Sequence, residues 1–113
     1  MTRSVGTGLL HHVELWVPDL RRTTASWGWL LEELGYQAFQ CWDDGISFRL
    51  GPTYLVFERS PDLEAGPHQR TRAGLNHLAF HAGNRASVEV TACAALVRTA
   101  STMPASAHAG TRW

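Results

Sequence analysis

The sequence contains no lysine and no long apolar run. Its ten basic residues are all arginine, and ten acidic residues balance them, so the formal net charge is zero. Proteins that bind nucleic-acid phosphates normally carry a basic excess, and the balance therefore argues against a nucleic-acid partner. No apolar stretch approaches the ~18–20 residues that a membrane span needs, so no membrane association is expected.

Cysteine is scarce, and a secretion signal is absent. Cys41 and Cys93 are far apart in the sequence and form no C-x-x-C motif. The N-terminal residues lack the apolar stretch of about 7–15 residues that a signal peptide requires. Two unclustered cysteines without an export signal predict free thiols in a cytoplasmic protein.

Carboxylates are missing from the C-terminal part of the chain. The last acidic residue is Glu89, and residues 99–113 are rich in alanine, serine and threonine. Such a segment predicts an irregular tail at 99–113. The whole chain has 113 residues, of which 44% are hydrophobic and 18% charged, as expected for a single globular domain.

Hydrophobic periodicity predicts a strand, then a helix, then three strands. Residues 9–17 alternate between an apolar face and a face that carries His12, Glu14 and Trp16, as in a half-buried strand. Residues 20–34 repeat apolar side chains with the helical period, with Asp19 as N-cap and Gly35 as C-cap. Further strands are expected at 36–41, 46–50 and 53–59.

The second half of the sequence predicts part of the same pattern. Residues 60–74 are polar and contain two prolines and two glycines, which predicts a loop. Residues 75–81 alternate like a strand, and 85–98 are weakly helical.

A short internal repeat links the two halves. The segment Leu10-x-His12-Val13-x-Leu15 is similar to Leu75-x-His77-Leu78-x-Phe80, 65 residues later. The repeat predicts an α+β fold built from a βαβββ unit at 8–59 and an incomplete second unit, a strand plus a helix, at 75–98. All of it would belong to one domain spanning residues 1–113.

His12, Glu58 and His77 are the candidate metal ligands. The two histidines occupy equivalent positions of the repeat, and Glu58 ends the last strand of the first unit. Two imidazoles and a carboxylate on rigid strands suit a divalent Zn, Ni, Fe or Mn ion. A single strand histidine more often only makes a local hydrogen bond, but the matched pair favours the ligand interpretation.

The segments LLHHVELWVPDL, YLVFE and LNHLAFHA resemble the vicinal oxygen chelate superfamily, which includes glyoxalase I, bleomycin-resistance proteins and extradiol dioxygenases. The pattern H-x-x-L-x-V-x-D-L is read here from His12 to Leu20. The resemblance covers roughly residues 8–90 and implies that His12, Glu58 and His77 are metal ligands. It also implies a homodimer.

The function implied is that of a divalent-metal-dependent lyase or isomerase acting on a small oxygen-chelating substrate, with Glu58 as the base that moves a proton. Glu14, Trp16, Arg49 and His81 would line the substrate cup. The family has a fourth ligand, a glutamate that the repeat would place near position 123, beyond this sequence.

Three other interpretations stay open. The chain could bind a small molecule or drug without catalysis, as bleomycin-resistance proteins do. It could be an inactive homologue, truncated or frame-shifted after about residue 90. An extradiol dioxygenase fits less well, because in those enzymes the ligand glutamate comes from the strand that is missing here.

Overall fold

The structure, a computed structural model, describes residues 5–87 and residue 89. The chain divides into two compact units, Met1–Leu63 and Glu64–Trp113. Each unit is treated separately below. No helix in the described part of the chain is long and apolar enough to cross a membrane.

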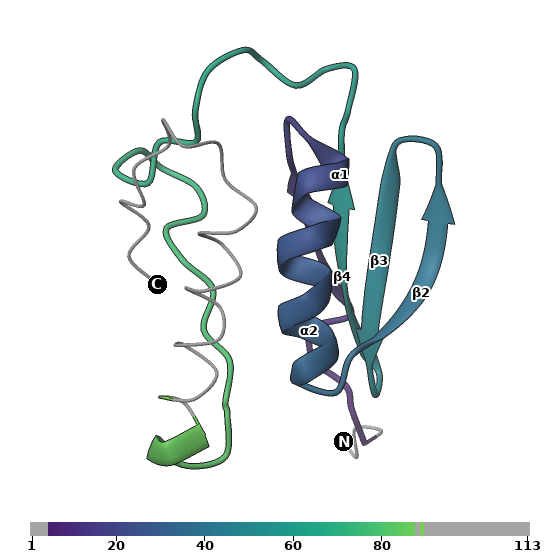
Figure 1. Cartoon of the computed structure of the whole chain (residues 1–113), viewed down its shortest axis with the longest axis vertical. Coiled ribbons are helices and arrows are strands. Elements are labelled where there is room, and N and C mark those ends of the chain that lie inside the picture. The colour runs from purple at the N-terminus through teal and green to yellow at the C-terminus, as the bar shows by residue number, and fades with distance from the viewer. Residues whose placement is uncertain (1–4, 88, 90–113) are drawn as a thin grey trace. The chain divides into compact units, whose positions relative to one another are not determined.

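The first unit is a four-stranded sheet with one helix across a face (Figure 1). Its elements are β1 (His12–Trp16), α1 (Leu20–Thr23), η1 (Thr24–Gly28), α2 (Trp29–Glu33), β2 (Gln37–Trp42), β3 (Gly45–Leu50) and β4 (Thr53–Glu58). The strand order is β1-β4-β3-β2, with β1 parallel to β4 and the other pairs antiparallel. This confirms the predicted βαβββ unit.

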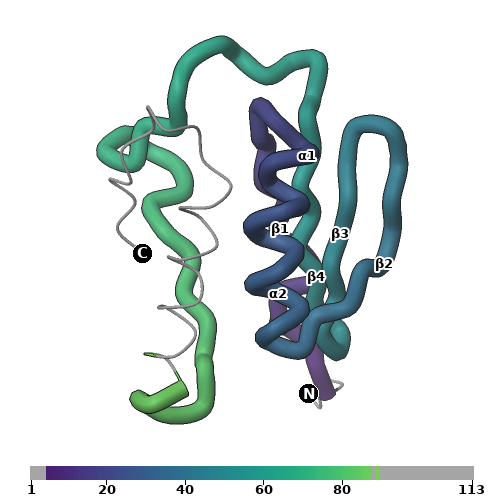
Figure 2. Tube along the Cα trace, viewed as in Figure 1, coloured from purple at the N-terminus to yellow at the C-terminus, as the bar shows by residue number. Residues whose placement is uncertain are grey.

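The helix connects β1 to the rest of the sheet, as the tube trace shows (Figure 2). The Asp19 carboxylate accepts a hydrogen bond from the Arg22 amide at 3.0 Å, and Gly35 ends the helix with a φ of 94°. The predicted N-cap is therefore confirmed, whereas Leu34 is the C-cap and Gly35 follows it in the left-handed conformation. Parallel strands need a long crossover, and this helix supplies it.

The middle turn of the helix, η1, is π-helical, which the sequence did not predict. A Cβ on Gly28 would lie only 3.2 Å from the Phe48 ring. The glycine therefore allows the widened turn to approach the sheet closely. Hydroxyl groups of Thr23, Thr24 and Ser26 donate to carbonyls four residues earlier along this segment.

The core of the first unit lies between the helix and the sheet. Leu31 is fully buried, and Phe48, Leu55 and Phe57 are at most 5% exposed. Phe48 and Phe57 contact each other edge to face at 6.3 Å. The alternation that predicted the strands thus places their apolar residues under the helix.

β2 contains a bulge that the sequence did not predict. The register with β3 shifts between Ala38 and Cys41, so Phe39 and Gln40 together oppose Ser47. The amide freed by the bulge, that of Gln40, donates to the Ser47 hydroxyl at 3.1 Å. The bulge turns Phe39 toward Tyr54 and Arg49.

In the second unit, residues 75–82 form no strand, although a strand was predicted for 75–81. Alternation persists there, since Leu78 and Phe80 are half-buried while His77 and His81 are exposed. A strand is defined by its hydrogen-bonded neighbour, and the described residues offer this segment none. The predicted strand is therefore wrong for this structure. Residues 85–87 and 89 are helical, and the rest of the predicted helix and tail lies outside the described residues.

We expect Leu31→Ala to destabilise the first unit by about 2–5 kcal/mol, because it opens a cavity in a closed core. Urea denaturation followed by circular dichroism measures the change. The matched control is Leu9→Ala, since Leu9 is 63% exposed and lies before β1. Equal effects of the two substitutions would contradict this description of the core.

Candidate functional site

The face of the sheet that is turned away from the helix carries the predicted site residues of the first unit. We call it the site face. Parallel register pairs His12 with Tyr54, Glu14 with Val56 and Trp16 with Glu58. The adjoining strand adds Arg49, which pairs with Tyr54. The structure thus brings Glu14, Trp16 and Arg49 onto one face with His12 and Glu58.

The register separates His12 from Glu58. Glu58 lies four residues further along the strand direction than Tyr54, the neighbour of His12, which corresponds to roughly 13 Å. Two donors on one zinc ion lie within roughly 4.4 Å of each other, given bonds of about 2.0–2.2 Å. This spacing is between backbone positions, so the side chains of His12 and Glu58 would have to lean toward each other along the sheet to hold one ion.

The described residues contain no group of three or more His, Cys, Asp or Glu side chains that could hold a metal ion. His77 belongs to the second unit, where the Asn76 side-chain oxygen lies 2.7 Å from its Nδ1. Because that oxygen can only accept, Nδ1 donates and the Nε2 of a neutral ring keeps its lone pair. The ligand set of His12, Glu58 and His77 stays a prediction.

Near the start of β1, His12 lies in an aromatic cluster. Its ring stacks on Tyr54 at 4.8 Å with an angle of 5° between the planes. His11 packs edge-on against the same tyrosine, and Phe39 lies 5.5 Å from it. The Nδ1 atoms of His11 and His12 are 2.9 Å apart. The sequence pattern assigned the ligand position to His12 rather than to His11, and it did not indicate Tyr54, which only the register places beside His12.

Glu58 lies at the other end of the site face, beside Glu14. The Trp16 indole donates to Glu14 Oε2 at 2.8 Å, and the Trp42 indole hydrogen-bonds to Glu58. Trp42 packs directly over Gly45, where a side chain would overlap its indole. Two tryptophans thus flank a pair of carboxyl groups.

The pKa of the Glu58 carboxyl is raised above its ordinary value of 4.5. Burial contributes most, followed by the charge of Glu14 and hydrogen bonding between the two carboxyls, and Asp44 adds a smaller contribution. The hydrogen bond from Trp42 acts in the opposite direction. Adjacent carboxylates resist double ionisation, so this pair can hold a proton near one end of the site face.

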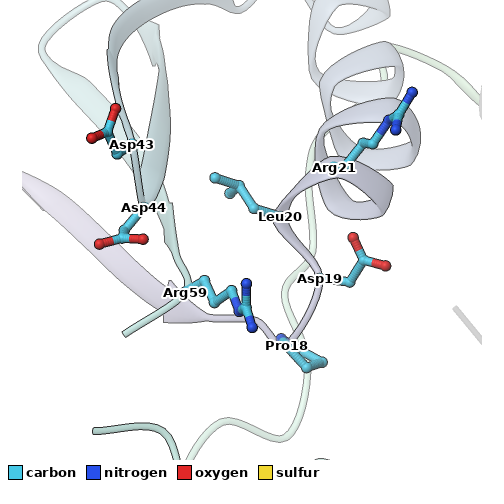
Figure 3. A pocket seen from close by; sticks show the side chains of 7 residues that line it. All are labelled: Pro18, Asp19, Leu20, Arg21, Asp43, Asp44 and Arg59. Atoms are coloured by element: carbon cyan, nitrogen blue, oxygen red, sulfur yellow. The ribbon is translucent and has the colours of Figure 1, made fainter. Parts of the chain in front are cut away.

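A separate polar cavity of about 390 Å³ lies where the helix begins and the β2–β3 turn meets the end of β4 (Figure 3). It is lined by Pro18, Asp19, Leu20, Arg21, Asp43, Asp44 and Arg59. The Arg59 amide donates to the Asp44 carbonyl at 2.7 Å, which ties the two edges together. No predicted metal ligand or cup residue lines this cavity.

His81, the remaining predicted cup residue, is exposed in the second unit. Its place in a cup therefore stays a prediction.

The fold and its site face define a βαβββ module of α+β type. The sequence profile of the Glyoxalase/Bleomycin resistance protein/Dioxygenase superfamily matches residues 11–111. The chain belongs to this superfamily.

Two known proteins show substantial sequence similarity to the chain. The uncharacterized protein YqjT of Bacillus subtilis (strain 168) is 48% identical over 82 residues, which are 71% of this chain and 63% of YqjT. The chain therefore spans less than two thirds of the length of that relative. A candidate glyoxalase from Bacillus halodurans, known from a crystal structure, is 46% identical in sequence to this chain, with a TM-score of 0.76. The match covers 80% of this chain and 69% of the Bacillus halodurans chain.

A more distant structure shares the fold alone. Lactoylglutathione lyase from Agrobacterium tumefaciens is 17% identical in sequence to this chain, with a TM-score of 0.51. The match covers 94% of this chain and 78% of the Agrobacterium tumefaciens chain.

At neutral pH, Glu58→Gln should be more stable than the wild type, and this difference should shrink toward acid pH. The pKa of Glu58 is higher in the folded protein than in the unfolded chain. The free energy of unfolding therefore falls as the pH rises from the unfolded-state pKa through the folded-state pKa. Glutamine removes that loss and keeps the hydrogen-bonding groups. Thermal unfolding midpoints between pH 4 and pH 8 should show variant and wild type converging toward pH 4.

The matched control for this experiment is Glu33→Gln, at an exposed carboxyl on α2. The difference in unfolding midpoint between Glu33→Gln and the wild type should not change with pH in the way that it does for Glu58→Gln. If both variants showed the same pH dependence, the interpretation of Glu14 and Glu58 as interacting carboxyl groups would be wrong.

Proposed function

We propose that this chain binds a small oxygen-bearing molecule against the site face. The observation that carries this proposal is the exposure of three aromatic side chains around the predicted site residues. Trp16, Phe39 and Trp42 are 45%, 43% and 38% exposed. Large exposed aromatic side chains beside a few polar groups are typical of ligand sites rather than of solvated surface.

The polar groups on the site face complement such a ligand. Arg49 lies over the Phe39 ring, with its guanidinium carbon 4.6 Å from the ring centre, and can offer donors to a carboxylate or carbonyl. At the other end, the Glu14–Glu58 pair can accept hydrogen bonds from hydroxyl groups. The aromatic rings supply apolar contact between them.

A second candidate is the metal-dependent lyase or isomerase activity that the superfamily suggests. The 46% identity to the candidate glyoxalase from Bacillus halodurans favours it. In that case Glu58 would act as the base, since a raised carboxyl pKa is suited to proton transfer near neutral pH. A divalent ion, with His12, Glu58 and His77 as ligands, and a homodimer are further parts of this proposal.

Ligand binding can be tested with ¹⁵N-labelled protein and a library of small hydroxycarbonyl, carboxylate and aromatic compounds. Compounds that bind should shift amide resonances of β1 and β4. We expect Trp16→Ala to weaken them about 2- to 12-fold, which is the range for losing one aromatic stacking partner. Titration by nuclear magnetic resonance measures the dissociation constants.

The control is again Glu33→Gln, on the helix, which should leave the affinities unchanged. Shifts confined to the cavity at Pro18 and Arg59, or affinities insensitive to Trp16→Ala, would contradict a ligand on the site face. Repeating the titration after chelation separates the two candidates, because metal-free binding survives it.

A further inference from the structure

His11 and His12 hold two imidazole nitrogens in a geometry suited to one metal ion. Their Nδ1 atoms are 2.9 Å apart, and the ring planes meet at 74°. Two nitrogens bound at right angles to one ion, with bonds of about 2.05 Å, are separated by about 2.9 Å. The same 2.9 Å is the length of the hydrogen bond between the two rings, so it shows that both nitrogens can reach one ion and selects no coordination geometry.

The backbone around the pair is fixed to the start of β4. The Tyr54 amide donates to the His11 carbonyl at 3.2 Å, and the Thr53 hydroxyl donates to the Leu10 carbonyl at 2.7 Å. The stacking of His12 on Tyr54 fixes the second ring. Such support reduces the ordering cost that a chelating pair otherwise bears on binding.

Both histidines are exposed, so the remaining coordination positions would be open to water or to oxygen atoms of a ligand. Without an ion, one Nδ1 must carry a hydrogen and donate it to the other. When an ion binds, that ring changes to the tautomer with hydrogen on Nε2, and both Nδ1 lone pairs become available. Two neutral rings therefore release no net proton.

We infer that His11 and His12 form a bidentate site for a divalent ion that favours imidazole nitrogen, Cu²⁺ or Ni²⁺, at the start of β1. Imidazole is a good ligand for both ions, and the affinity of nitrogen sites for divalent metals is highest for Cu²⁺. The site differs from the ligand set implied by the superfamily, because it uses His11 and does not use Glu58. It is also compatible with the register, which places His12 beside Tyr54 and away from Glu58.

Titration of the whole chain with Cu²⁺ tests the inference, with calorimetry for affinity and electron paramagnetic resonance for the number of coordinated nitrogens. His11→Ala should lower the affinity at least about tenfold and remove one coupled nitrogen from the spectrum. His12→Phe should do the same while keeping a ring to stack on Tyr54. Glu58→Gln and the control His68→Ala should bind Cu²⁺ like the wild type.

The opposite pattern would overturn the inference. If His11→Ala leaves affinity and spectrum unchanged, His11 is no ligand, whatever the other variants show. If Glu58→Gln weakens binding as strongly as His12→Phe, the ion binds with the set that the superfamily implies. Circular dichroism of each variant separates loss of a ligand from loss of the fold.

Discussion

The parallel pairing of β1 with β4 is the constraint on which the rest of the first unit depends. It can form only because the helix of residues 20–33 carries the chain back across the sheet. Once the strands are paired, the register decides which side chains adjoin each other. It places His12 against Tyr54 and Glu58 against Trp16. The chemistry of the site face follows from that pairing rather than from the order of residues along the chain.

Much of the first unit could be predicted because its signals are local. Alternating residues in β1, the N-cap Asp19 and Gly35 at the end of the helix each act within a few positions of the sequence. The bulge at Phe39 and the π-helical turn before Gly28 could not be predicted in this way. They depend on contacts with Ser47 and Phe48, which are distant in sequence.

For the candidate site, the sequence supplies a list of candidate residues but not their arrangement. The repeat selected His12 and His77 by equivalence of position, and Glu58 was selected because it ends the last strand of the first unit. Neither criterion specifies which partner each side chain finds. The strand predicted at 75–81 failed for a related reason. Its alternating pattern requires a neighbouring strand to supply hydrogen bonds, and pattern alone cannot provide that neighbour.

The site face therefore carries two different chemical groups at its two ends. The histidine pair offers imidazole nitrogens, and Glu14 beside Glu58 forms a pair of carboxyl groups in which the pKa of Glu58 is raised. Both pairs are assembled within the first unit, each from contacts close to β1. Roughly 13 Å of strand separates the backbone positions of His12 and Glu58, so the two pairs lie at different ends of the site face. A molecule long enough to reach from His12 to Glu58 could contact both, with Trp16 and Phe39 providing the apolar contact between them.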